Sequence, residues 1–199
     1  ELVTAAEAIT DASSNTYGFV ARGLKNANTP VWTALMLGYD QKAVGEDGTL
    51  NTENADAISA AATYQELMTE TAPRGVTGFN WSECQSAFLQ GKVGMWLDGI
   101  GFAAPLENPE LSRVVGKVGY GVMPRGPGAH HCVMTQTAFG IAETSRKKGP
   151  SWLYLQWASG RTNQLRYLTS GAGSPARAST YRNDEAISSS RFPKEFFDS

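Results

Sequence analysis

The sequence predicts an α/β fold, and three observations support this prediction. A helix with clear capping signals leads directly into an alternating strand near residues 80–102, helices and strands alternate along the rest of the chain, and no internal repeat is visible. The chain has 199 residues, of which 41% are hydrophobic and 18% are charged. A chain of this size can bury one sizeable core or two small lobes. We therefore expect a globular protein.

Charge and cysteine content exclude several functional classes. The formal net charge is −2, and the longest basic run is Arg146 to Lys148, so we expect no nucleic-acid partner. No apolar run reaches the roughly 20 residues that a membrane-spanning helix needs. Cys84 and Cys132 are too few for a disulfide framework and too far apart for a zinc pair, so we expect two buried free thiols.

The first forty residues predict a helix, a strand and a second helix. Apolar residues recur at helical spacing within residues 1–11, and the polar residues 13–15 end that pattern. Residues 17–21, Tyr-Gly-Phe-Val-Ala, favour a strand. Residues 31–37 predict a short buried helix, which Gly38 would end in the left-handed conformation.

A turn and the longest helix follow. Gly45-Glu-Asp-Gly48 predicts a turn. We expect Asn51 or Thr52 to cap the helix after it, because both side chains can accept a hydrogen bond from a free helix N–H group. The expected buried face of this helix consists of Ala57, Ala60, Ala61, Tyr64, Leu67 and Met68.

The central stretch combines a helix, a turn and a strand. Asn80 and Glu83 have the spacing of a capping box, and Gly91 can take the left-handed stop. Apolar residues alternate with Gly94 and Trp96 over residues 93–97, which predicts a strand. A strand edge that carries polar and aromatic groups is a candidate ligand site. The groups at this edge are Asp98, Gly99 and Phe102.

The second half of the chain predicts two strands and two helices. Residues 117–123 alternate and lead into the Pro- and Gly-rich residues 124–128, which we interpret as a hinge or crossover. Residues 137–142 predict a buried strand. We expect Ser145 to open a helix that tolerates Pro150 in its first turn, and Thr162 to cap another that ends at Gly171.

In this order, the motifs resemble a known family. They are Tyr17-Gly-Phe, Phe88-Leu-Gln-Gly-Lys-Val-Gly-Met-Trp, Gly119-Tyr-Gly-Val-Met-Pro-Arg-Gly-Pro-Gly, Phe139-Gly-Ile-Ala and Gly171-Ala-Gly-Ser-Pro-Ala-Arg-Ala-Ser-Thr-Tyr181. The series resembles the extracellular solute-binding proteins of ABC sugar importers, the family of maltose-binding protein. The resemblance covers roughly residues 1–185 and depends on the ordered series more than on any single motif.

This resemblance implies a type II periplasmic-binding-protein architecture. Two lobes would close on a sugar or sugar alcohol and then dock on a membrane permease, with no cofactor and no catalysis. The location would be periplasmic or extracellular, with a lipid anchor in a Gram-positive organism. Nothing here matches the N-terminal lobe segment of such proteins, so we expect a fragment that lacks this segment. We expect the parent protein to be a monomer. The surface that the missing segment would leave exposed predicts self-association of the fragment.

The resemblance also divides the chain. Residues 1–122 would form most of the second lobe, and residues 123–134 would cross between the lobes. Residues 135–170 would be the returning part of the first lobe, and residues 171–199 a return to the second lobe with a C-terminal tail.

Carried over position by position, the resemblance implies a set of ligand-binding residues. Arginine forks, carboxylates and amides can orient the hydroxyl groups of a sugar, while an aromatic face packs on its C–H surface. Trp96 is expected in the core unless its strand face turns it outward. The candidates are Arg22, Trp32, Asp98, Gly99, Phe102, Thr135, Gln136 and Arg177.

Other functional classes stay open at this point. A carbohydrate-active hydrolase would need paired carboxylates, for which Asp98 and Glu107 are the candidates, and a scaffold protein would need no polar cleft. His130-His131-Cys132 is a weak candidate for a metal ion or a thiol nucleophile, because adjacent strand residues point to opposite faces and no third ligand has a familiar spacing. The sequence does not distinguish one sugar from another.

Overall fold

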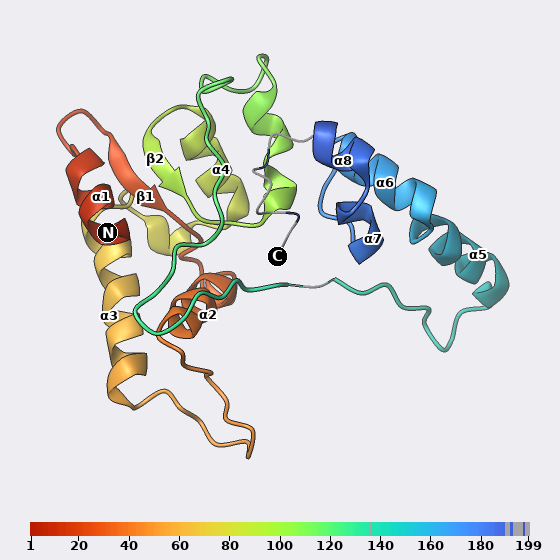
Figure 1. The fold of residues 1–199 in the computed structure, drawn as a ribbon, viewed down its shortest axis with the longest axis horizontal. Helices are drawn as coiled ribbons and strands as arrows, with labels where there is room; N and C mark the ends of the chain where they lie inside the picture. The colour runs from red at the N-terminus through yellow and green to blue at the C-terminus, as the bar shows by residue number, and fades with distance from the viewer. Residues whose placement is uncertain (136, 190–191, 193–196, 198–199) are drawn as a thin grey trace. The chain divides into compact units, whose positions relative to one another are not determined.

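The computed structural model of the chain describes residues 1–135, 137–189, 192 and 197 (Figure 1). The chain divides into two compact units. The first consists of Glu1–Gly99, Pro105–Val118 and Val122–Met134, and the second of Ile100–Ala104, Gly119–Gly121 and Thr135–Ser199. Within the described residues, the first unit combines helices with two strands, which further helices separate along the chain, and the elements of the second unit are helical. The expected α/β class is confirmed.

The elements of the first unit build one small sheet with helices beside it. The strands β1 and β2 pair in parallel, with Phe19 opposite Met95 and Val20 opposite Trp96. In Figure 1, α1 and α3 lie beside β1, and α4 lies beside β2. The elements are α1 (Leu2–Ile9), β1 (Tyr17–Val20), α2 (Thr29–Gly38), α3 (Ala55–Glu70), the 3₁₀ turn Val76–Gly78, α4 (Trp81–Leu89) and β2 (Val93–Trp96).

The second unit contains α5 (Lys148–Ala158), α6 (Arg161–Thr169), α7 (Ala178–Tyr181) and α8 (Asp184–Ser189). Two short 3₁₀ turns, Ile100–Phe102 and Ala104–Glu107, follow the strand β2 along the chain. No helix among the described residues is both long enough and apolar enough to cross a membrane.

The hydrophobic core lies between the sheet and its helices. Phe19 and Val20 of β1 are fully buried against Leu67 of α3 and Cys84 of α4. A second cluster joins α2 to α3 and consists of Met36, Ala57 and Ala60. Each buried large apolar side chain contributes about 1.5–3 kcal/mol relative to its exposed state. The sheet is therefore anchored by helices from distant parts of the sequence.

The local signals around α4 are confirmed. The Asn80 side chain accepts a hydrogen bond from a free N–H group of the helix, and the Glu83 carboxylate accepts one from the Asn80 N–H at 2.9 Å. These backbone hydrogen bonds lower the pKa of Glu83. Gly91 has a φ of 71° and ends the helix as expected. Gly171 likewise has a φ of 69° after α6.

Several boundary predictions are wrong. Asn54, rather than Asn51 or Thr52, caps α3, and its side chain accepts a hydrogen bond from the Ala57 N–H. Gly38 stays helical, and Asp40 with a φ of 58° takes the left-handed position instead. Gly160 rather than Thr162 precedes α6, α5 begins at Lys148 rather than Ser145, and Ala61 is exposed. Only at α3 did a neighbouring residue with the same cap chemistry take the predicted place, and the starts of α5 and α6 carry no side-chain cap.

The two strands predicted over residues 117–123 and 137–142 are also wrong. Both segments are irregular, and within the described residues the sheet consists of β1 and β2. A strand is stable only when a neighbouring strand pairs its N–H and C=O groups. The alternating pattern was present in these segments, but the described part of the chain supplies no such neighbour.

Gly18 allows α1 to pack closely against β1. A Cβ atom at position 18 would overlap the backbone carbonyl of Ala6, which is itself fully buried. The helix could not move away without opening the core around Phe19. We expect Gly18→Ala to destabilise the fold by about 3 kcal/mol, at the upper end for overpacked cores, in chemical denaturation.

Gly78→Ala is the matched control for this substitution. A Cβ at Gly78 would meet nothing within 4 Å, and no positive φ is found there. Equal unfolding midpoints for the two variants would contradict the close packing inferred for Gly18.

Candidate functional site

The candidate site begins where the two parallel strands end. Because β1 and β2 run in the same direction, the residues that follow them meet at one edge of the sheet. The Leu97 N–H donates to the Val20 carbonyl at 3.1 Å and extends the pairing by one step. Arg22 follows β1 and Asp98 follows β2, so the sheet brings together two residues that are 76 positions apart.

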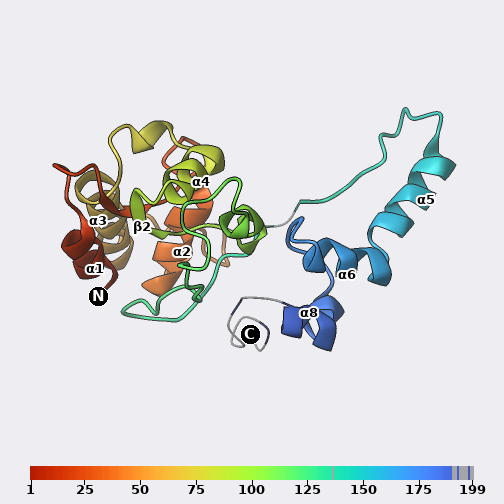
Figure 2. The same ribbon diagram turned by 90° about the horizontal axis from the view of Figure 1, so that it is seen from above.

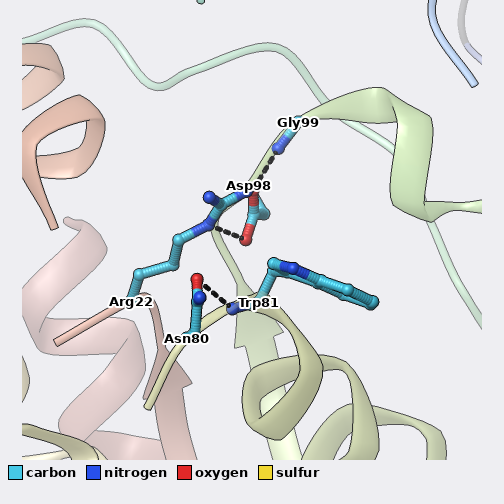
Figure 3. A network of polar contacts seen from close by, with 5 residues as sticks. All are labelled: Arg22, Asn80, Trp81, Asp98 and Gly99. Atoms are coloured by element: carbon cyan, nitrogen blue, oxygen red, sulfur yellow. Dashed lines mark hydrogen bonds and ion pairs between the residues drawn. The ribbon is translucent and has the colours of Figure 1, made fainter. Parts of the chain in front are cut away.

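Arg22 and Asp98 form a two-point ion pair. The Arg22 Nε donates to Asp98 Oδ2 at 2.9 Å, and the Arg22 Nη2 donates to Asp98 Oδ1 at 2.6 Å (Figure 3). The Asp98 side chain is 7% exposed and the Arg22 side chain 21% exposed. The hydrogen bond to Asp98 raises the pKa of Arg22. A fork of this type fixes the orientation of the guanidinium plane, which a single contact would leave free to rotate.

The backbone on both sides of the pair is held in place. The Gly99 N–H donates to Asp98 Oδ1 at 2.7 Å. The N–H groups of Gly23 and Leu24 both donate to the Phe79 carbonyl, at 3.1 and 2.9 Å. A Cβ on Gly23 would overlap the Val76 carbonyl, so only glycine permits this close approach. The segment that carries Arg22 is thereby fixed beside the start of α4.

Trp81 is a further candidate residue, which the sequence analysis did not name. Its segment adjoins that of Arg22 through the hydrogen bonds to Phe79, and Figure 3 shows its indole together with Arg22, Asp98 and Gly99. The Asn80 Oδ1 accepts a hydrogen bond from the Trp81 N–H at 2.8 Å, and the Trp81 side chain is exposed. The sequence did offer a signal for Trp81, because it is an aromatic residue at the first position of a capped helix.

Cys84 is a buried neighbour of the pair, and its thiol is unreactive. It is fully buried, and burial together with the negative charge of Asp98 raises the pKa of its thiol to about 12. A thiol with this pKa is protonated at neutral pH and is no nucleophile. Cys132 is exposed, which corrects the prediction that both thiols are buried.

The two tryptophans of the first unit that the sequence analysis considered pack against hydrophobic clusters. Trp32 is half-buried against the cluster of Met36, Ala57 and Ala60. Trp96 packs on Phe88 of α4, with ring centroids 5.9 Å apart, so it faces the core. The structure thus brings Arg22, Asp98 and Gly99 together, and Trp32 packs on the second cluster.

A second group of predicted residues belongs to the other unit. Within that unit, Gly101 lies against Ser174, so the Ile100–Phe102 turn adjoins the loop 171–177. Arg177 is exposed and donates from Nη1 to the Ser159 carbonyl at 3.2 Å, and the Gln164 side chain accepts from the Ala176 N–H at 2.8 Å. Thr135 is exposed, and Gln136 lies outside the described residues.

The alternative chemistries find no support in these contacts. Both oxygens of Asp98 accept hydrogen bonds from Arg22, which does not suit a general acid, and Glu107 accepts from the Gly116 N–H at 3.4 Å. His130 Nε2 lies 2.7 Å from the Met123 carbonyl. Among the described residues, no group of three His, Cys, Asp or Glu side chains could hold a metal ion. An open hollow at the opposite edge of the sheet, lined in part by Tyr17, Arg74 and Lys92, is separate from the Arg22–Asp98 pair.

Comparisons with known proteins agree with the fold. The family of bacterial extracellular solute-binding proteins matches residues 1–165. The chain is 25% identical over 185 residues to the erythritol/L-threitol-binding protein of Mycolicibacterium smegmatis, and the match covers 87% of this chain and 38% of that protein.

Solved structures give the same result. An ABC transporter solute-binding protein from Agrobacterium radiobacter in complex with ribitol matches with a TM-score of 0.79 and 25% identity, covering 99% of this chain and 49% of that one. Maltose-bound MalE3 of T. maritima matches with a TM-score of 0.82 and 20% identity, covering 99% and 51%. The chain therefore spans about half the length of these structures and less of the curated relative. Both the expected family and the two-lobed fold class are confirmed.

The Arg22–Asp98 pair is expected to stabilise the fold because removing one partner leaves a half-buried charge. For Asp98→Asn we expect a loss of about 2 kcal/mol, below the 3–5 kcal/mol of fully buried pairs because Arg22 keeps some exposure. The double variant Arg22→Gln with Asp98→Asn should lose less than the sum of the single variants.

The exposed pair Lys148–Glu143 provides the control for this test. Its N–O distance is 2.7 Å, close to that of the site pair, but the two side chains are 47% and 97% exposed. Glu143→Gln should change the free energy of unfolding by less than about 0.5 kcal/mol. Similar losses for the two pairs would contradict the role of burial.

The two thiols should differ strongly in reactivity. A raised pKa lowers the thiolate fraction, so at pH 8 Cys84 should react with an aromatic disulfide about 1,000-fold more slowly than an ordinary thiol, in addition to its protection by burial. Exposed Cys132 should react promptly. The measurement is the release of chromophore over time, with Cys132→Ser as the control that removes the fast phase. Two equivalents released at similar rates would contradict the burial of Cys84.

Proposed function

Because this chain belongs to the bacterial extracellular solute-binding protein family, we propose that it is part of the binding component of an ABC importer for a small neutral sugar or sugar alcohol. The observation that carries this proposal is the Arg22–Asp98 fork at the ends of the two parallel strands. Family members bind ligands for transport and do not transform them, so we propose binding without catalysis for this chain as well.

The electrostatics of the fork favour a neutral ligand. The positive charge of Arg22 and the negative charge of Asp98 compensate each other at 2.6 Å. A charged solute, such as an amino acid or a phosphate, would need one of these charges for itself and would have to break the pair. A polyol instead offers hydroxyl groups that donate and accept at once, and an exposed aromatic side chain such as Trp81 can cover its C–H surface.

The relatives support the same ligand class. The names of two of them mention erythritol or L-threitol and ribitol, which are uncharged and carry a hydroxyl group on every carbon. We extend the proposed ligand-binding set to the other predicted residues. Alongside Arg22, Asp98 and Gly99 it comprises Trp32, Phe102, Thr135, Gln136 and Arg177, to which the structure adds Trp81 as a candidate.

The division into lobes is part of this proposal. Residues 1–122 would belong to the second lobe, 123–134 to the crossing, 135–170 to the first lobe and 171–199 to the second lobe again. A ligand that contacts both lobes binds the closed state better than the open one and so shifts the population toward it. A permease that recognises the closed form would then accept the ligand, at the outer face of a cell membrane or in the periplasm.

The binding proposal predicts a ligand-dependent thermal shift. At a hundred times its dissociation constant, a ligand should stabilise the fold by about 2.7 kcal/mol, which corresponds to several degrees. The panel contains erythritol, L-threitol, ribitol, D-mannitol and, as charged competitors, amino acids. The melting temperature is measured by tryptophan fluorescence, on the 199-residue chain and on the longest polypeptide that its gene encodes.

Arg22→Lys should weaken polyol binding at least about tenfold, because a lysine cannot reproduce the planar fork. Arg74→Lys, at the opposite edge of the sheet, is the control and should leave the affinity unchanged. A shift with amino acids and none with polyols would overturn the proposed ligand class. Turnover of an aryl glycoside would favour the hydrolase instead.

A further inference from the structure

The peptide group between Arg22 and Gly23 is held at both of its ends. The Tyr64 hydroxyl donates a hydrogen bond to the Arg22 carbonyl at 3.3 Å. On the other side of the same planar group, the Gly23 N–H donates to the Phe79 carbonyl at 3.1 Å. Because the carbonyl and the N–H belong to one rigid plane, the two bonds together fix its orientation. The backbone that carries Arg22 is thereby tied to α3 as well as to the segment before α4.

The glycine at position 23 makes this attachment necessary. Glycine has no Cβ atom to restrict the neighbouring dihedral angles, so a peptide group that precedes it can rotate more freely than one that precedes another residue. A larger residue, which would restrict the rotation, does not fit here, because a Cβ on Gly23 would overlap the Val76 carbonyl. Close packing thus demands a glycine, and hydrogen bonds have to supply the rigidity that the glycine lacks.

The core places Tyr64 for this role. Tyr64 lies in α3, which packs against α2 (Figure 2) and contacts β1. Its ring is half-buried against the hydrophobic core that contains Phe19 and Leu67. Burial raises the pKa of its hydroxyl group, and a hydrogen bond with the Asn28 side chain lowers this pKa to a smaller extent. The hydroxyl is therefore protonated at neutral pH and can donate to the Arg22 carbonyl.

The fork between Arg22 and Asp98 depends on the position of the Arg22 backbone. Its two bonds, of 2.9 and 2.6 Å, both require the guanidinium plane to meet the carboxylate edge on. Rotation of the adjoining peptide plane would change the direction in which the Arg22 side chain leaves the backbone, and an error of about 0.5 Å or 10–20° spoils a preorganised site. We propose that Tyr64 is a positioning residue for Arg22, whose hydroxyl group holds the Arg22–Gly23 peptide plane in the orientation that the fork needs.

This inference rests on the proposed binding function for its consequence, but its first test needs no ligand. The test is the hydrogen exchange of the Arg22 Nε–H, followed by NMR on the 199-residue chain. The signal is identified as the one that Arg22→Lys removes. The bond from this N–H to Asp98 slows its exchange, and Tyr64→Phe should accelerate the exchange about two- to tenfold, the range that corresponds to the loss of one neutral hydrogen bond.

Tyr39→Phe is the matched control. The Tyr39 hydroxyl lies 2.9 Å from the hydroxyl of Thr63, the residue before Tyr64 in α3, and Tyr39 packs on the second cluster. Both variants remove one hydroxyl contact of α3 from a half-buried ring, so both should lower the melting temperature by a similar few degrees. Tyr39→Phe should leave the exchange of the Arg22 Nε–H unchanged.

Polyol affinity is the second readout. It is measured on the longest polypeptide that the gene encodes, with whichever of erythritol, L-threitol, ribitol and D-mannitol gives the largest thermal shift. Tyr64→Phe should raise the dissociation constant about two- to tenfold, because a smaller fraction of the protein then has the fork in place, and Tyr39→Phe should not change it. Added to Arg22→Lys, Tyr64→Phe should have a smaller effect than alone, since it acts through Arg22.

An unchanged exchange rate of the Arg22 Nε–H in Tyr64→Phe would overturn the proposal. Equal effects of the two tyrosine variants on this rate or on the affinity would also overturn it, because they would indicate a general loss of stability. If the unaltered protein bound no polyol, the proposed function would fail instead, and the exchange rate would still decide whether Tyr64 positions Arg22.

Discussion

The parallel pairing of β1 with β2 is the constraint on which the rest of the first unit depends. It joins residues 17–20 to residues 93–96 in parallel. The intervening chain, which contains α2, α3 and α4, therefore has to lead from the end of β1 back to the end of the sheet where both strands begin. The helices bury Phe19 and Val20, and the pairing in turn sets the positions of Arg22 and Asp98. One pairing therefore determines both the core and the candidate site.

The Arg22–Asp98 pair connects the stability of this edge with the proposed binding site. Removing two charges from water costs several kcal/mol, and the two-point geometry helps to offset this cost together with the hydrogen bond that the Gly99 N–H donates to Asp98 Oδ1. The pair is therefore a rigid polar surface rather than a reactive one. The proposed binding of a neutral polyol would use this rigidity, since the guanidinium plane is oriented before a ligand arrives and little side-chain entropy would be lost on binding.

Local chemistry explains which features were predictable from the sequence. The Asn80–Glu83 capping box and the left-handed Gly91 depend on residues only a few positions apart, and both were predicted correctly. The fork between Arg22 and Asp98 depends on strand pairing across 76 positions, so the sequence placed both residues at strand ends but not in contact. Trp81 was missed because its importance depends on the Gly23–Phe79 backbone contact rather than on its own neighbours.

The difference between local and long-range contacts also explains why two strand predictions failed and why one helix exposes its apolar side chains. Alternating apolar residues over 117–123 and 137–142 show that these segments could form strands with one buried face. A strand also needs a partner strand, and the described residues supply none for these segments. In α5, the helix formed because its hydrogen bonds are internal, while its aromatic side chains stayed exposed. A strand without a partner loses its secondary structure, whereas a helix without one keeps its shape and exposes its apolar side.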